Sequence, residues 1–163
     1  MKYFLFLFAV YSFSAVFTSC GTSDVKHTEN TVSKRIDYLP VKNGVLHGAG
    51  EEGISQGVMG ISSIEDYNEL INKMNSINEE VEDDIITNER FFEEEMLIFV
   101  FDKVRGTGGY AFEIEEIIEN NEVLKVKVVS KPPSDPATSV MTQPYQIVSI
   151  NKSDKELSLE VIE

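Results

Sequence analysis

A continuous apolar run near the middle of the chain limits its possible folds more than any other feature. Residues 96–101 read Met-Leu-Ile-Phe-Val-Phe, with no polar side chain among them. Strands of a half-solvated sheet alternate apolar and polar residues, whereas a strand that is covered on both faces is apolar throughout. The run therefore predicts a strand in the interior of the domain.

The residues after this run alternate instead, which indicates strands with one buried face. The apolar positions fall into two series, Tyr110, Phe112 and Ile114, and then Leu124, Val126 and Val128. The alternation slips at 115–116, because Ile117 and Ile118 are adjacent, and this slip predicts a β-bulge. Asn120-Asn121 separates the two series. Because asparagine tolerates positive φ, the pair predicts a hairpin turn.

One amphipathic helix is predicted ahead of the apolar run. Ser62 and Glu65 have the spacing of a capping box, in which each side chain bonds the backbone of the other residue. The apolar residues that follow recur at helical spacing and form one stripe, which we interpret as a core contact: Ile64, Tyr67, Ile71 and Met74.

Weaker strand signals complete the pattern. They lie at 36–41, at 57–61 in a glycine-rich stretch, at 139–141, at 145–150 and at 157–161. Pro144 is expected to break the strand between 139–141 and 145–150, because proline cannot donate a ladder hydrogen bond. Together the signals predict an α+β fold, a predominantly antiparallel β-sheet meander or sandwich with one main helix. A single domain is expected over 35–163.

The amino terminus has the pattern of a secretion signal. Lys2 precedes a mostly apolar stretch, and small polar residues then precede Cys20, the one cysteine of the chain. The pattern resembles a bacterial lipobox, which implies cleavage before Cys20 and acylation of its thiol and new amine. We expect a lipoprotein signal peptide at 1–19, a flexible tether at 20–34 and a lipid-anchored protein of the bacterial cell envelope, at the outer membrane or cell surface. An ordinary signal peptide with an incidental cysteine is the alternative.

The charge of the chain excludes one class of partner. It has 28 acidic and 14 basic residues, a formal net charge of −14. Nucleic acids and anionic lipid surfaces are bound through Lys and Arg side chains that neutralise phosphate. We therefore expect no nucleic-acid partner, and contact with a membrane only through acyl chains, of which two or more anchor stably.

Residue types that carry catalysis are sparse. The two histidines are His27 in the tether and His47 in the glycine-rich stretch, and we interpret both as ordinary polar residues. No serine lies in a Gly-x-Ser-x-Gly elbow, and the acidic run at 79–84 lacks the glycine of a calcium loop. A lipidated Cys20 is no nucleophile. We expect no metal, no cofactor and no enzymatic activity.

A glycine-rich loop follows the apolar run and is the first candidate for a binding element. It reads Arg105-Gly106-Thr107-Gly108-Gly109-Tyr110. Its glycines permit positive φ and close backbone approach. It is no phosphate cradle, because it lacks the Gly-Lys-Ser/Thr ending and no helix is predicted after it. On these residues alone, a tight connection between two strands is the simplest interpretation.

Five short segments within residues 91–150 carry a resemblance to a known family. They are 91–96, Gly106-Thr107-Gly108-Gly109-Tyr110, Glu113-Ile114, Lys131-Pro132-Pro133 and Gln143-Pro144-Tyr145-Gln146-Ile147-Val148. In order and spacing they resemble the C-terminal domain of the protease-complex subunit PrcB family. The resemblance implies a secreted or lipid-anchored protein and a non-catalytic subunit that associates with a surface protease.

Two of these segments are also similar to the inhibitory loops of chagasin-type cysteine-protease inhibitors, which lie at one end of an immunoglobulin-like sandwich. The segments are 107–110 and 143–145. Alternate connections of a meander lie at the same end of the sheet, so the 105–109 and 131–138 connections are expected to lie together. Tyr110 and Tyr145 would then offer the kind of rigid amphipathic area that is enriched in interface hot spots.

The leading hypothesis is a lipid-anchored, non-enzymatic protein that binds a protein partner, expected to be a secreted or surface protease. The residues expected to contact this partner are Arg105, Thr107, Gly108, Gly109, Tyr110, Pro144 and Tyr145. A protease inhibitor with chagasin-like loops is the alternative. The third hypothesis is a small-ligand-binding or enzymatic lipoprotein that uses the acidic face.

Overall fold

The computed structural model describes residues 33–78, 81, 88–134 and 137–163 of the 163-residue chain. The predicted signal peptide, Cys20, His27, the tether up to residue 32 and most of the acidic run at 79–84 lie outside the described residues. The elements in chain order are β1 (Ser33–Ile36), β2 (Leu39–Leu46), β3 (Gly57–Ile61), α1 (Ile64–Met74), α2 (Phe91–Glu94), β4 (Glu95–Phe101), β5 (Ala111–Asn120), β6 (Val123–Lys131), β7 (Gln143–Asn151) and β8 (Glu156–Ile162).

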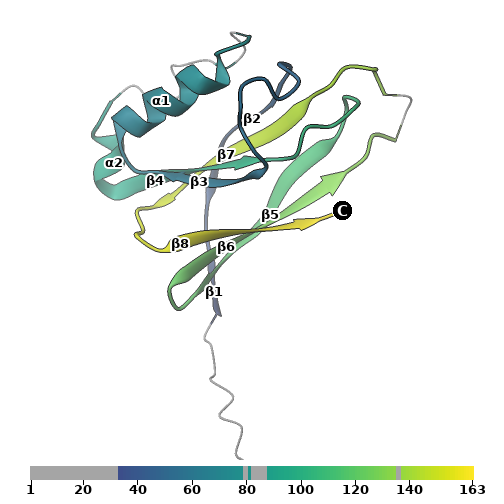
Figure 1. Cartoon of the computed structure of the whole chain (residues 1–163). Helices are drawn as coiled ribbons and strands as arrows, with labels where there is room; N and C mark the ends of the chain where they lie inside the picture. Colours follow the sequence, from purple (N-terminus) through teal and green to yellow (C-terminus); the bar gives the residue numbers. More distant parts are fainter. Residues whose placement is uncertain (1–32, 79–80, 82–87, 135–136) are drawn as a thin grey trace, which may run out of the picture. The chain divides into compact units, whose positions relative to one another are not determined.

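The strands form two four-stranded sheets that pack against each other, and α1 covers the outer face of one of them (Figure 1). The first sheet has the order β1-β5-β6-β8 and the second has the order β2-β7-β4-β3. All pairs are antiparallel except β6 with β8, which is parallel. The predicted α+β class, with a predominantly antiparallel sandwich and one main helix, is confirmed.

Among the strands from β4 onward only β5 and β6 pair consecutively, whereas a meander would require every strand to pair with the next one along the chain. The chain changes sheets between β4 and β5, between β6 and β7, and between β7 and β8. The burial of each strand gives the reason. Because β4 is apolar on both faces, it belongs at the centre of the covered second sheet. In contrast β5 and β6 alternate, so they belong to the first sheet, which has one solvated face.

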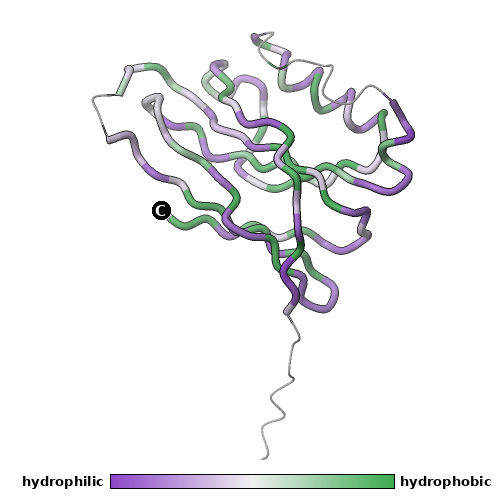
Figure 2. The backbone as a smooth tube through the Cα atoms, turned by 180° about the vertical axis from the view of Figure 1, so that it is seen from behind, coloured by the Kyte–Doolittle hydropathy of each residue, from purple (hydrophilic) through white to green (hydrophobic). Residues whose placement is uncertain are grey.

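The strand β4 separates two apolar clusters. Leu97, Phe99 and Phe101 pack with α1 in one cluster, whereas the alternate residues of β4 pack with β5 and β6 in the other. Every residue from Met96 to Phe101 is at most 4% exposed, so the predicted strand with two buried faces is confirmed. Figure 2 shows α1 as alternating hydrophobic and hydrophilic patches, as expected for a helix that covers a sheet with one face.

The bulge, the hairpin turn and the helix cap were each predicted from a short stretch of sequence. The register of β5 against β6 shifts between Ile114 and Glu116, and Asn121 adopts a φ of 44°, so the predicted bulge and turn are confirmed. The helix cap is one residue later than expected. The Ser63 hydroxyl, not that of Ser62, accepts the Asp66 N–H at 3.1 Å.

Three strand predictions were wrong. The strand β2 continues to Leu46, beyond the strand signal at 36–41, and the sequence did not show this because β2 is a partly exposed edge strand with little apolar alternation. Pro144 lies inside β7 rather than breaking it. Its carbonyl accepts the Asp102 N–H at 2.9 Å, and it stands opposite Val45 in the edge strand. The expected strand at 139–141 is absent from the described residues, where only Thr142 makes a bridge, with Arg105.

Candidate partner-binding site

The loop between β4 and β5, residues 102–110, lies against the later part of the loop between β6 and β7, residues 137–142. Arg105 N–H donates to the Thr142 carbonyl at 2.7 Å, and Thr142 N–H returns a bond of 3.0 Å. The Thr142 hydroxyl donates to the Thr107 carbonyl at 3.1 Å, and Gly108 N–H donates to the Thr138 carbonyl at 3.1 Å. The expectation that these connections share one end of the fold is confirmed, although each of them joins two sheets.

The first loop is held by a buried ion pair that the sequence analysis did not predict. The carboxylate of Asp102, which is fully buried, accepts Arg105 Nε at 2.7 Å and a second guanidinium N–H at 3.0 Å. This fork matches the planar guanidinium, so the two bonds fix both position and orientation. The guanidinium also donates to the Ser130 hydroxyl at 2.7 Å and to Glu163 Oε1 at 3.0 Å. One side chain therefore joins the ends of β4, β6 and β8.

The electrostatics of this cluster follow from its geometry. Burial opposes the charged form of Arg105, but the hydrogen bonds and charges of Asp102 and Glu163 outweigh burial and raise the pKa of the guanidinium. A hydrogen bond from Lys103, and then one from Arg105, lower the pKa of Glu163. Arg105 is 8% exposed. The residue predicted to contact a partner is thus occupied inside the protein, where it braces the loop.

Tyr110 is placed by this same guanidinium. The Arg105 Cζ lies 4.4 Å from the centroid of the Tyr110 ring, a cation–π contact. The preceding residue, Gly109, has a φ of 82°, a backbone angle that residues with a side chain rarely adopt. This conformation lets the chain turn into β5. Tyr110 is half-buried, so one part of its surface packs on the braced loop and the other part faces outward.

Tyr145 occupies a different environment. It is 3% exposed and its ring lies 6.3 Å from that of Phe101, within the cluster beneath α1. Gly44 on β2 makes room for it, since a Cβ there would lie 2.5 Å from the Tyr145 hydroxyl oxygen. The Tyr145 side chain is therefore packed into the protein and does not project from its surface.

The two tyrosines nevertheless line one depression. It has a volume of about 390 Å³ and lies between β2, the start of β5 and β7. Its lining comprises Asn43, Gly44, Val45, Tyr110, Ala111, Phe112, Glu113, Pro144 and Tyr145. The structure thus brings together Tyr110, Pro144 and Tyr145 from the predicted set. Gly106, Thr107 and Gly109 lie at the nearby loop surface, and Gly108 is buried, where a Cβ would lie 2.8 Å from Thr138 Oγ1.

Two exposed apolar side chains in the second loop were not predicted as candidates. Val140 is 47% exposed and Met141 is 48% exposed, and both directly precede the Thr142 bridge to Arg105. The sequence signal was an apolar pair beside a proline-rich loop, which we read as a strand.

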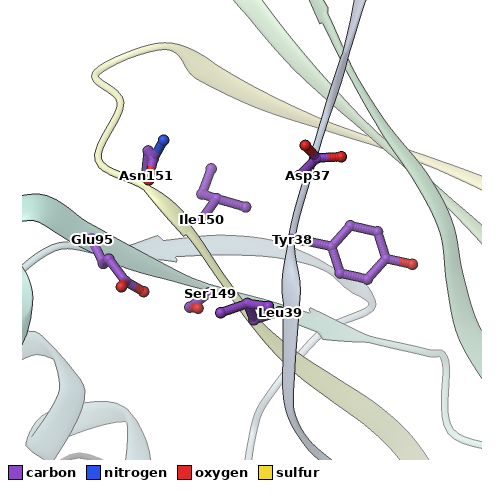
Figure 3. Close-up of a pocket in the computed structure, with 7 residues that line it drawn as sticks. All are labelled: Asp37, Tyr38, Leu39, Glu95, Ser149, Ile150 and Asn151. Carbon is purple, nitrogen blue, oxygen red and sulfur yellow. The ribbon is translucent and has the colours of Figure 1, made fainter.

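A smaller depression of about 190 Å³ lies where the chain crosses from β1 to β2. Figure 3 shows Leu39 beside Ser149, whereas the Tyr38 ring extends away from Glu95 and Ser149. The Tyr38 hydroxyl donates to the Ile114 carbonyl of β5 at 2.8 Å. Among the described residues no group of three or more His, Cys, Asp or Glu side chains is arranged to hold a metal ion. No helix in the described part of the chain is long and apolar enough to cross a membrane.

Comparison with known proteins bears on the same region. Residues 96–151 match a family model described as PrcB C-terminal. This part of the chain is similar to the PrcB C-terminal domain. The predicted resemblance is thereby confirmed, over about a third of the chain. The matched segment runs from β4 to β7 and includes both loops, whereas β1, β2, β3 and β8 lie outside it. No curated protein and no solved structure matched the chain.

Proposed function

We propose that this chain is a lipid-anchored, non-enzymatic protein of the bacterial envelope that binds a secreted polypeptide at the depression beside Tyr110. The expected partner is a protease, because the similarity to the PrcB C-terminal domain implies association with a protease complex. The observation that carries the proposal is the convergence of Tyr110, Pro144 and Tyr145 on one open depression at the braced loops.

The physical support is preorganisation. A binding surface that is already rigid loses less conformational entropy when the partner docks. Arg105 fixes its loop to β4, β6 and β8 through short charged hydrogen bonds, and Thr142 ties the second loop to the first. Tyrosine is enriched among residues that carry binding energy, because it buries a large area at low entropy cost.

The chagasin-like alternative finds no support in the geometry. An inhibitory wedge needs loop residues that project into a protease cleft. Gln143, Pro144 and Tyr145 are instead part of β7 and buried, at 1% and 3% exposure for the first and last of them. A binding subunit should leave the hydrolysis of model substrates by cysteine and serine proteases unchanged, whereas inhibition would revive this alternative.

The direct test is recovery of the partner from envelope extracts. Tyr110→Ala should lower the recovery by about tenfold or more, since hot-spot truncations cost about 2 kcal/mol. Ile77→Ala is the matched control, because Ile77 is 45% exposed and follows α1, outside the depression. Tyr145→Ala is unsuitable, since emptying a buried aromatic site costs about 3–5 kcal/mol of stability. Equal recovery by wild type and Tyr110→Ala would refute the site.

A further inference from the structure

The strand β5 has one edge that is covered along only part of its length. On the side away from β6, its neighbour is β1, and β1 pairs only with residues 117–120. The chain then leaves the first sheet after Ile36 and crosses to the second sheet as β2. Among the described residues, no strand continues β1 alongside Ala111–Glu116, so this half of β5 is an open strand edge.

Side chains occupy the part of this open edge that is nearest to β1, where the Glu115 carbonyl accepts the Arg35 guanidinium at 3.2 Å. The Ile114 N–H donates to Gln146 Oε1 at 2.6 Å, and the Ile114 carbonyl accepts the Tyr38 hydroxyl at 2.8 Å. These two contacts take the place of the hydrogen bonds that a neighbouring strand would make. Ile114 is 5% exposed. Because its N–H and its carbonyl bond these two side chains and not β6, both groups point toward the open side.

The next position of the edge is Phe112. Backbone groups along an antiparallel strand face alternate sides, and β5 is in regular register with β6 from Ala111 to Ile114. The Phe112 N–H and carbonyl therefore point to the same side as those of Ile114. That side is the depression of about 390 Å³, whose other walls are β2 and Tyr145. The depression therefore occupies the space beside β5 that a longer β1 would fill.

We propose that an extended segment of the partner adds to the first sheet here, pairing with the backbone of Phe112 as a short antiparallel continuation of β1. This inference rests on the proposed function and specifies how the depression binds. Main-chain hydrogen bonds supply affinity in strand addition, and pockets for alternate side chains supply specificity. The segment would place an aromatic or long apolar side chain between Tyr110 and Tyr145. A basic residue would face Glu113, which is exposed at the rim of a chain with net charge −14.

The experiment starts from a phage-displayed library of random dodecapeptides, selected on the full chain biotinylated at its amino terminus. Peptides that are enriched on wild type over Tyr110→Ala are synthesised and titrated into isotopically labelled wild-type protein. We expect apolar and basic residues to alternate in them, and the Phe112 amide to become protected from hydrogen exchange by at least about tenfold. Methylation of the peptide nitrogens that face β5 should weaken binding by at least about tenfold, and methylation of the alternate nitrogens should not.

The outcomes separate the binding mode from the binding site. Peptides that need Tyr110 but leave Phe112 unprotected and tolerate methylation at both sets of nitrogens would overturn strand addition, while the depression would stand as a binding site. Protection confined to β2, around Gly44 and Val45, would equally overturn it, because the segment would then extend the second sheet. A library that yields no peptide dependent on Tyr110 would overturn both proposals.

Discussion

Replacing Arg105 by methionine should destabilise the domain far more than a surface substitution. Methionine keeps much of the apolar stem but removes the guanidinium that faces Asp102. The Asp102 carboxylate is fully buried, and it would keep only the Lys103 N–H at 2.8 Å, the Ser130 hydroxyl at 3.2 Å and Gln56 at 3.4 Å. Removing one partner of a buried ion pair leaves an uncompensated charge and costs about 3–5 kcal/mol.

This cost has two further consequences that can be measured. A loss of about 3–5 kcal/mol lowers the thermal midpoint of a domain of this size by about 10 °C or more. The double variant Asp102→Asn/Arg105→Met should recover at least about 2 kcal/mol relative to the sum of the single variants, because replacing both partners removes the orphaned charge. Urea unfolding of the four proteins in a double-mutant cycle measures the coupling free energy, and thermal unfolding of the same proteins gives the midpoints.

The control for this cycle is Glu163→Gln, which removes the negative charge of the half-exposed carboxylate in the same cluster. Because solvent screens that contact, the thermal midpoint should change much less than in Arg105→Met. A loss below about 1 kcal/mol for Arg105→Met, or strict additivity of the two single variants, would show that the ion pair does not brace the loop.

Three other predictions follow, two from the structure and one from the sequence of the amino terminus. Gly44→Ala should lower stability by about 1–3 kcal/mol in urea unfolding, because its Cβ would lie 2.5 Å from the Tyr145 hydroxyl oxygen. Gly106→Ala is the control and should not lower it, because a Cβ there would meet no atom within 4 Å. Equal effects of the two substitutions would contradict this packing. Glu119 and Glu163 have pKa values lowered below 4.5 by hydrogen bonds from Lys155 and from Lys103, respectively, so the stability they contribute is present above the unfolded-state pKa and is lost as pH falls through the folded-state pKa. Thermal midpoints between about pH 5 and pH 3 should therefore fall less steeply in Glu163→Gln than in wild type, and parallel curves would oppose this. Cys20→Ala should abolish incorporation of labelled palmitate in the native host, and retained label would contradict acylation at Cys20.

The elements that followed from the sequence were those with strong local signals. The continuous run at 96–101, the slip at 115–116 and the stripe along α1 each have one physical explanation, and each is seen in the structure. The edge strand β2 could not be found this way, since a partly exposed strand lacks clear alternation. Pairing order was also beyond local pattern, because the parallel contact of β6 with β8 joins segments that are separated by a whole strand of the other sheet.

The candidate site shows the same division. Glycines and tyrosines marked the two loops, and the loops do lie together. The roles of individual side chains depended on tertiary contacts that no local pattern contains. Arg105 was expected to face a partner, yet it binds Asp102, and the buried acid directly after an apolar strand was the signal that pointed to an internal counter-ion. Tyr145 was expected to project, yet Gly44 on a distant strand gives it room to pack inward.

The central claim is that a polypeptide docks at the depression beside Tyr110. A photoreactive phenylalanine analogue at position 110 tests it most directly in intact envelopes, with the same analogue at position 77 as the control. We expect ultraviolet light to join position 110, but not position 77, to one partner, and the crosslinked peptide to map to a single extended segment. Crosslinks of equal yield at both positions, or none at position 110, would contradict the claim.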